Sequence, residues 1–291
     1  MVLSAEAPGV NTMEELLATL NPSDTALDLG CGPGSFDYSR YLFRVVGIDL
    51  HLDAPTLFRD NGRVQYVQSS AGEIPLQDGS VDLVFCHHTL EHFPDYKRTL
   101  SEIGRVLRPE GLLWIAVPDG YSFDDVLFRH IFSGGGHVNQ FRRVELTRDV
   151  SALTGTSLVQ SVRLYSGFVY LKIPTEEQLV HFPETAKYLA EIPERLSTLW
   201  ITIVNLVTRV VDKTLGSEAS LYGWGLVFSR GSIEVASMKS CFNVCWNCGS
   251  GNAADDLDRE GLISSWLGLR VYRCRGCNRR NFFLKPPEGT D

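Results

Sequence analysis

The chain has 291 residues, of which 44% are hydrophobic, and this allows one sizeable core with material left for a small second unit. Its formal net charge of -8 at pH 7 excludes a surface that is basic throughout, of the kind that grips nucleic acid or anionic lipid, although a local basic patch would still fit. The charge therefore favours a small or neutral substrate.

The start of the chain and its longest apolar stretch both bear on location. Residues 1–11 lack a basic start and a continuous apolar run, so we expect no signal peptide and a cytoplasmic protein. The stretch Leu196–Val211 is interrupted by Asn205 and Arg209 and is shorter than the ~20 residues of a bilayer span, so we expect no membrane span. Its helical spacing favours a face that packs on the domain over a membrane-surface anchor. That face would consist of Leu199, Ile203, Leu206 and Val210.

Short apolar runs rich in Val, Ile and Leu alternate with segments of helical spacing in the first part of the chain. The runs are residues 26–29, 45–48, 64–67, 81–85 and 112–117. Their length and composition predict buried parallel strands. One intervening segment, Pro94–Leu107, predicts a helix that "RPEG" ends. Strand alternating with helix predicts an α/β fold with a doubly wound sheet.

The second part of the chain departs from this alternation. We expect a helix near Val144–Leu153 and strands around Leu158–Leu164 and Leu221–Arg230. Between the two strands, about 166–220, two helices form an insertion that could determine specificity. A boundary near 231–240 divides a first domain, residues 1–232, from a C-terminal module, residues 240–286.

The strongest local signal is "DLGCGPG", Asp28–Gly34, directly after the first predicted strand and before a helix expected to begin near Ser35. The glycines at 30, 32 and 34 remove the Cβ atoms that would keep a ligand from the backbone. A dinucleotide-binding GxGxxG loop would place its third glycine at position 35. An acidic residue before the loop also suits a cation better than a pyrophosphate, and S-adenosylmethionine (SAM) carries an ammonium and a sulfonium.

Further residues extend this predicted cofactor site. Asp49 lies nineteen residues past Gly30 at the end of the second predicted strand, where a carboxylate can accept hydrogen bonds from both ribose hydroxyls. Ser70 and Ala71 follow the third strand, within reach of an adenine ring. The full predicted set is Asp28, Gly30, Cys31, Gly32, Gly34, Asp49, Leu50, Ser70, Ala71 and Cys86.

Taken together, Met13–Leu164 resembles the class I SAM-dependent methyltransferases, in particular the type 11 group acting on quinones, sugars and other small molecules. The resemblance is carried by "DLGCGPG", "GIDL", "IPLQDGSVDLV", "HHTLEHFPD" and "LSEIGRVLRPEGLLWIAVPD". It implies a Rossmann-like sheet of seven strands, mostly parallel with the last one antiparallel, and a methyltransferase activity (EC 2.1.1.-). The family usually has Asp where this chain has Ser70, so adenine recognition here would be weaker or come from backbone.

Histidines are the candidates for chemistry. His87, His88 and His92 follow the fourth strand, where the carboxyl ends of strands form the active crevice, and any of them could deprotonate an attacking hydroxyl. The resembled family keeps "LEH" with unrelated substrates, so His92 could instead cap or pack. His137 follows "GGG" on a candidate lid, in a structural or a catalytic role.

Cys245, Cys248, Cys274 and Cys277 form two CxxC pairs, which resemble the knuckles of a zinc ribbon. Four thiolates satisfy tetrahedral zinc, and a module this small needs such a tie to fold, so we expect a structural Zn²⁺ without catalytic function. Cys241 is left over. Arginines and aromatics beside the cysteines could bind RNA or an acidic partner, and a solvated face is the other interpretation. The basic residues are Arg270, Arg273, Arg275, Arg279 and Arg280, offset by Asp255, Asp256 and Asp258.

Three hypotheses follow from these patterns. The first is an enzyme that methylates a small-molecule acceptor at oxygen, with the ribbon as a docking or stability element. The second keeps the methyltransferase but makes RNA or protein the substrate, delivered by the ribbon. The third is a SAM-binding protein without turnover.

Overall fold

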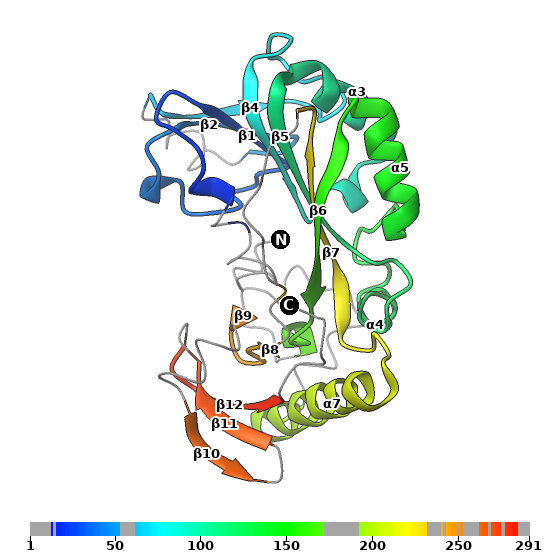
Figure 1. Ribbon diagram of the computed structural model, residues 1–291. Helices are drawn as coiled ribbons and strands as arrows, with labels where there is room; N and C mark the ends of the chain where they lie inside the picture. The colour runs from blue at the N-terminus through cyan, green and yellow to red at the C-terminus, as the bar shows by residue number, and fades with distance from the viewer. Residues whose placement is uncertain are drawn as a thin grey trace.

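The computed structural model describes residue 13 and residues 16–52, 62–171, 192–231, 240, 243–249, 251–252, 262–266, 269–274 and 277–284. A sheet of seven strands dominates these residues (Figure 1). Its strands are β1 (Thr25–Leu29), β2 (Arg44–Asp49), β3 (Val64–Gln68), β4 (Val81–His87), β5 (Leu107–Pro118), β6 (Ser157–Tyr165) and β7 (Leu221–Ser229). The five strands predicted from the apolar runs are confirmed, and so are the two expected around 158–164 and 221–230. Strand β5 begins earlier than expected and includes the "RPEG" segment.

The sheet has the order β3-β2-β1-β4-β5-β7-β6. Strands β1 to β5 pair in parallel, and β7 runs antiparallel to both β5 and β6. The last strand is therefore antiparallel, as predicted, and it lies between two others rather than at the edge. Because β1, β2, β3 and β4 are parallel, their carboxyl ends meet along one edge of the sheet, and the segments that follow them can form a single site.

Helices are α3 (Tyr96–Val106), α4 (Phe123–Ile131), α5 (Arg143–Thr154) and α7 (Glu194–Leu215), with 3-10 turns η1 (Tyr38–Arg40), η2 (Leu90–His92) and η3 (Val169–Leu171). Figure 1 shows α3 and α5 side by side along one face of the sheet. A Cβ on Gly104 would lie 2.7 Å from the Thr154 Cα, so this glycine allows the two helices to approach closely. On the other face, Met13, Leu16 and Leu17 pack into a second core with residues of η1.

The prediction of a helix beginning near Ser35 is wrong. Between β1 and β2 the structure has only the turn η1, which the Asp37 side chain caps by accepting from the Ser39 backbone N–H. The aromatic rings of Phe36 and Tyr38 lie 4.7 Å apart and pack on the sheet in place of a helical face. Burial of these two rings and the cap at Asp37 therefore stabilise a turn in this short connection.

The face assigned to the helix at 196–211 is also wrong. In α7 the apolar side chains of Leu199, Ile203 and Val210 are 52%, 41% and 43% exposed, whereas the polar residues Asn205 and Arg209 are buried. Further exposed apolar side chains on this helix are Leu196, Trp200, Val207 and Leu215. The helix therefore packs on the protein mainly through polar residues, together with the buried Ile201. Asn205 Nδ2 donates to the Gly167 carbonyl at 2.9 Å, and Arg209 donates to the Ser166 carbonyl at 2.7 Å.

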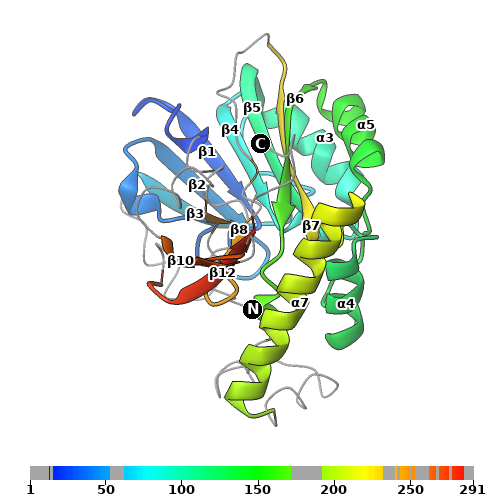
Figure 2. The same ribbon diagram turned by 60° about the horizontal axis from the view of Figure 1, so that its bottom comes forward.

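Short antiparallel strands form the C-terminal module, namely β8 (Asn243–Val244), β9 (Gly251–Asn252), β10 (Leu262–Trp266), β11 (Leu269–Arg273) and β12 (Arg280–Leu284). Figure 2 shows α7 beside β12, which it contacts. A Cβ on Gly167 would lie 3.0 Å from the Cys245 carbonyl, so the loop after β6 touches the first knuckle directly. Residues 232–239 of the expected boundary at 231–240, and Cys241, lie outside the described residues. Within the described ranges, no helix is long and apolar enough to cross a membrane.

Candidate active site

The glycine loop leaves the end of β1 as a tight turn. Its φ angles are +75° at Gly30, +48° at Gly32 and +125° at Gly34, which other residue types rarely adopt. A Cβ on Gly30 would lie 2.7 Å from Thr89 Cγ2, whereas one on Gly32 would meet no atom within 4 Å. Gly30 thus lets the loop pack against the segment after β4, and Gly32 presents bare backbone to open space.

Asp28 supports this loop from inside. Its carboxylate is fully buried and accepts hydrogen bonds from the Ser35 backbone N–H at 2.9 Å, the Ser35 hydroxyl at 2.7 Å and the Tyr38 hydroxyl. Burial raises the pKa of Asp28 above its usual value, and the bonds from Tyr38 and Ser35 oppose that rise. The expectation that Asp28 faces a ligand ammonium does not fit this burial. The carboxylate instead fixes the shape of the turn.

Asp49 closes the loop on its other side. One carboxylate oxygen accepts from the Gly32 backbone N–H at 2.8 Å, and the other accepts from the His51 N–H at 3.0 Å. A carboxylate has about four lone-pair sites, so both oxygens can accept further hydrogen bonds from a ribose. Leu50 beside it is 56% exposed. Cys31 is buried, and a Cβ on Gly47 would lie 2.9 Å from its sulfur, so the "GID" glycine makes room for the loop.

Ser70 and Ala71 line a surface hollow of about 230 Å³ that also includes Phe93. This hollow lies between the segments that follow β3 and β4, where the adenine end of a nucleoside is predicted. Cys86 does not share this position. It is fully buried in the core, and its sulfur lies 3.1 Å from the Thr89 hydroxyl, so its side chain offers no surface to a cofactor.

Two histidines at the end of β4 point into different surroundings. His87 Nδ1 accepts a hydrogen bond from Trp114 Nε1 at 3.2 Å inside the sheet, and burial lowers the pKa of His87 to about 4. His88 has φ +54°, an uncommon conformation for this residue type that is enriched at functional sites. Its Nδ1 lies 3.2 Å from the Tyr222 hydroxyl, while its buried Nε2 has no hydrogen-bond partner within the described ranges. Burial lowers the pKa of His88 well below 6.5.

A second group of polar side chains follows in η2 and the triple-glycine turn. Glu91, His92 and His137 place one potential ligand atom each within 4.8 Å of one another. His92 Nδ1 donates to the Gly136 carbonyl at 2.8 Å, and His137 Nδ1 lies 2.8 Å from Asp125 Oδ1. The φ angles of +92°, +59° and +79° at residues 134–136 explain the three glycines. The His137 side chain is only 8% exposed and is therefore held in place, unlike a residue on an open lid.

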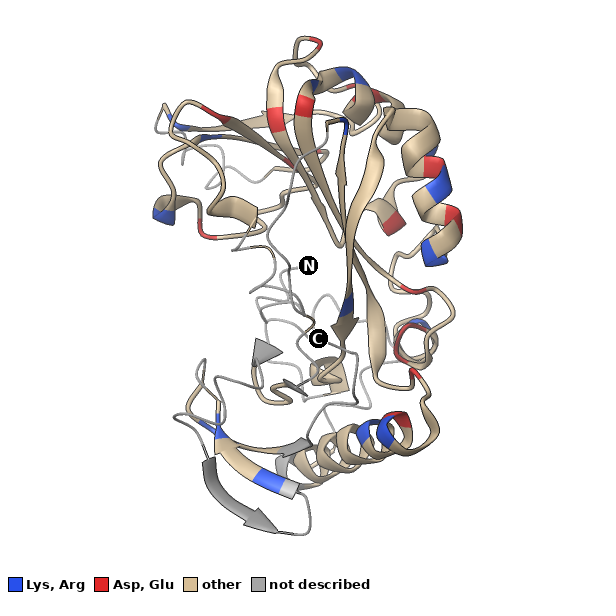
Figure 3. Ribbon diagram, viewed as in Figure 1, with Lys and Arg blue, Asp and Glu red and all other residues tan. Residues whose placement is uncertain are grey.

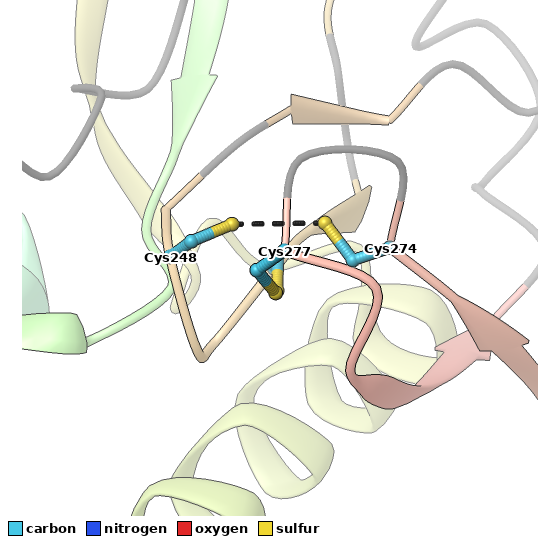
Figure 4. Close-up of side chains that lie close together, drawn as sticks. Cys248, Cys274 and Cys277 are labelled. Carbon is cyan, nitrogen blue, oxygen red and sulfur yellow. Dashed lines mark hydrogen bonds between the residues drawn. The ribbon is translucent and has the colours of Figure 1, made fainter.

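The four cysteines of the two CxxC pairs also come together. Their potential ligand atoms lie within 4.8 Å of one another, with Cys245 and Cys277 sulfurs 3.8 Å apart and Cys248 and Cys274 sulfurs 3.6 Å apart (Figure 4). These separations far exceed the ~2.05 Å of a disulfide bond. The hydrogen bond with Cys274 and burial raise the pKa of Cys245.

Residues 27–115 match the protein family described as a methyltransferase domain. This part of the chain is similar to methyltransferase domains. A relative named "Probable S-adenosylmethionine-dependent methyltransferase" from Mycobacterium tuberculosis is 36% identical over 110 residues, or 36% of this chain and 40% of the relative. An uncharacterized methyltransferase from Bacillus subtilis is 26% identical over 133 residues, or 43% of this chain and 51% of the relative. The chain thus spans about half or less of the length of these relatives.

Solved structures show the same fold. A phosphoethanolamine N-methyltransferase from Haemonchus contortus, in complex with phosphomonomethylethanolamine and S-adenosylhomocysteine, aligns with a TM-score of 0.51 and 21% identity over 77% of this chain and 53% of that chain. This likeness shows that the fold is Rossmann-like.

Several polar residues of the methyltransferase-type domain were not singled out from the sequence. Thr89 joins the glycine loop to β4, since its hydroxyl donates to the Leu29 carbonyl at 3.0 Å. Tyr222 contacts His88, although the two residues are far apart in sequence. Asp125 holds both His137 and Arg129, with its Oδ2 2.6 Å from the Arg129 Nε. Asp125 follows the helix-capping Ser122, a local pattern that could have marked the start of α4 but not its contact with His137.

Proposed function

We propose that this chain transfers the methyl group of SAM to an oxygen atom of a small-molecule acceptor. The observation that carries the proposal is the position of His88. Its backbone adjoins Thr89, which touches the glycine loop, and its buried Nε2 has no partner in the described part of the chain. A hydroxyl brought to that nitrogen would therefore lie close to the end of the predicted cofactor site.

The residues of the loop fit the nucleoside. Gly32 leaves its backbone open, the Asp49 carboxylate has spare lone pairs for the ribose, and the hollow beside Ser70 and Ala71 can take an apolar ring. Asp28 would act by holding the turn rather than by binding the ligand. When bound, SAM supplies a methyl group activated by its sulfonium.

In the transfer, the acceptor oxygen forms a bond to the methyl carbon, and the carbon–sulfur bond breaks with its electron pair remaining on sulfur. The acceptor hydroxyl loses its proton, which His88 Nε2 can accept when Nδ1 carries hydrogen and donates to the Tyr222 oxygen. Burial keeps His88 uncharged and raises the pKa of Tyr222 well above 10, so both groups are neutral at pH 7. The protein mainly aligns the acceptor and excludes water.

The test compares His88→Gln with the wild type. Removing a general base costs about 10²- to 10⁴-fold in kcat/KM, while the affinity for S-adenosylhomocysteine should change less than about threefold. His130→Gln, which changes an exposed histidine of α4, is the matched control. Turnover is measured as formation of S-adenosylhomocysteine over a panel of hydroxylated acceptors. Unchanged kcat/KM in His88→Gln would remove the base from the proposal, and no turnover with any acceptor would favour a binding protein.

We further propose that the four cysteines bind a structural Zn²⁺. Zn–S bonds of about 2.3 Å in a tetrahedron place sulfurs about 3.8 Å apart, which fits the observed 3.6 and 3.8 Å. Without a cation these packed thiols would stay protonated, and metal binding releases their protons. We expect one Zn²⁺ per chain by elemental analysis, and loss of it together with melting of the module in Cys274→Ser. A folded, zinc-free wild-type module would contradict this proposal.

Exposed arginines on the module favour a second candidate, in which RNA or a protein is the substrate. Arg273, Arg279 and Arg280 are exposed, and Figure 3 shows basic residues on β11 and α7. Binding through phosphates would weaken steeply with salt, and neutralising Arg273 and Arg279 should flatten that dependence. The domain limits at 1–232 and 240–286 and the cytoplasmic location stay predictions from the sequence.

A further inference from the structure

Glu91, His92 and His137 form a compact cluster beside the proposed acceptor site. The three residues come from η2 and from the turn after Gly136, and the backbone N–H groups of Val138 and Asn139 donate to the Glu91 carbonyl at 2.9 and 3.0 Å. These bonds join the two segments, so the cluster does not depend on side-chain contacts alone. Its imidazole rings lie 5.0 Å apart between centroids.

Both imidazoles have one nitrogen committed to an acceptor. A carbonyl can only accept, so His92 Nδ1 must carry a hydrogen and donate it to Gly136. His137 Nδ1 donates to the Asp125 carboxylate in the same way, and Phe128 stacks on its ring at 5.3 Å. Each neutral ring therefore keeps the lone pair of its Nε2. Histidines that bind metals are characteristically held through the other nitrogen by a carbonyl or carboxylate.

The third member is Glu91, which would supply a carboxylate oxygen as a ligand. Glu91 is 1% exposed, and its buried Oε2 has no hydrogen-bond partner among the residues that the structure describes. Leaving a carboxylate oxygen buried and unsatisfied costs free energy, so an occupied state of this cluster should be more stable than an empty one. A cation in contact with Oε2 would remove that cost.

We propose that Glu91, His92 and His137 bind one divalent transition-metal ion. Three atoms 4.8 Å apart share a centre about 2.8 Å from each, so a contraction of less than ~1 Å reaches bond lengths of about 2.1 Å. Two imidazoles and one carboxylate suit Zn²⁺, Fe²⁺ or Co²⁺ and leave coordination positions open. His92 is exposed, which gives the ion a path from solvent.

An open position on the ion could hold an oxygen of the acceptor, and this role rests on the proposed function. Coordination to a cation favours the deprotonated form of a hydroxyl, and it would orient the oxygen on the same side of the domain as His88. Binding of the ion does not require that role, because all three proposed protein ligands belong to this chain.

The experiment measures Co²⁺ content after equilibrium dialysis of the full-length protein. The wild type should take one Co²⁺ at the cysteines and a second at this cluster, and His92→Gln and Glu91→Gln should each lose one equivalent. His130→Gln is the control and should keep both. Because His92 is exposed, its substitution should preserve the fold, which far-ultraviolet circular dichroism checks.

The outcomes separate the proposals. An unchanged Co²⁺ content in His92→Gln and Glu91→Gln overturns the metal site, whatever the enzyme does. Loss of one equivalent with S-adenosylhomocysteine affinity retained supports it. If no variant and not the wild type bound S-adenosylhomocysteine, while the two variants still lost one equivalent of Co²⁺, the proposed function alone would be refuted.

Discussion

The bare backbone at Gly32 leads to a prediction that separates cofactor binding from stability. Gly32 has φ +48° and Gly79 has φ +60°, and a Cβ on either would meet no protein atom within 4 Å. Alanine at either position should therefore cost about 1–2 kcal/mol through the left-handed backbone alone. Only Gly32 lies on the predicted cofactor loop, so only there would the added methyl group meet a ligand.

We expect both Gly32→Ala and Gly79→Ala to lower the melting temperature by a few degrees, since ~1 kcal/mol corresponds to about 2–4 °C in a domain of this size. Gly32→Ala should also bind S-adenosylhomocysteine at least tenfold more weakly, equivalent to about 1.4 kcal/mol, whereas Gly79→Ala should bind it as the wild type does. Calorimetric titration measures both affinities. Equal affinities in the two variants would refute the assignment of the loop.

Three further predictions concern burial and charge. Burial raises the pKa of Asp124 to about 7. Between pH 4 and 7 the unfolded chain therefore releases a proton that the folded chain keeps. The free energy of unfolding should fall by up to ~4 kcal/mol as the pH rises through this range. Asp124→Asn should flatten that slope in urea denaturation. On α7, Asn205→Leu should cost about 1–3 kcal/mol, whereas Leu199→Lys should stay within ~0.5 kcal/mol. Asp49→Asn should weaken S-adenosylhomocysteine binding about tenfold or more, through weaker hydrogen bonds to the ribose.

Each of these predictions has a contrary result. If the dependence of the unfolding free energy on pH were unchanged in Asp124→Asn, the Asp124 carboxyl would be ionised in the folded protein. The control is Asp78→Asn, which changes a side chain that is 79% exposed. A large loss of stability in Leu199→Lys would show that the apolar face of α7 is covered. Wild-type affinity in Asp49→Asn would remove the ribose contact.

The sequence predicted the centre of the sheet well because β1, β4 and most of β5 are buried on both faces and read as continuous apolar runs. It also predicted the four-cysteine cluster, since CxxC spacing alone brings two sulfurs near each other. The helix near Ser35 failed because aromatic packing and the cap at Asp37 decide that connection, and neither has a helical period. The apolar spacing in α7 gave the correct element and the wrong buried face, since buried hydrogen bonds to the loop after β6 hold the helix.

The candidate site was predicted in part. The glycines follow β1 and Asp49 ends β2, so their proximity follows from the parallel pairing of these two strands. The partners of His88 and His137 could not be predicted from the sequence. Tyr222 lies on β7 and Asp125 on α4, and only the folded sheet brings these elements close to the two histidines. The burial of Asp28 and Cys86 was likewise invisible in the sequence, where an acidic residue or a thiol beside a glycine loop reads as a ligand contact.

The most direct test is equilibrium binding of S-adenosylhomocysteine to the folded wild-type protein, followed by competition. The account predicts one nucleoside per chain, displaced by S-adenosylmethionine and not by NAD. No binding by protein whose circular dichroism shows an intact fold, or displacement by NAD instead, would contradict it.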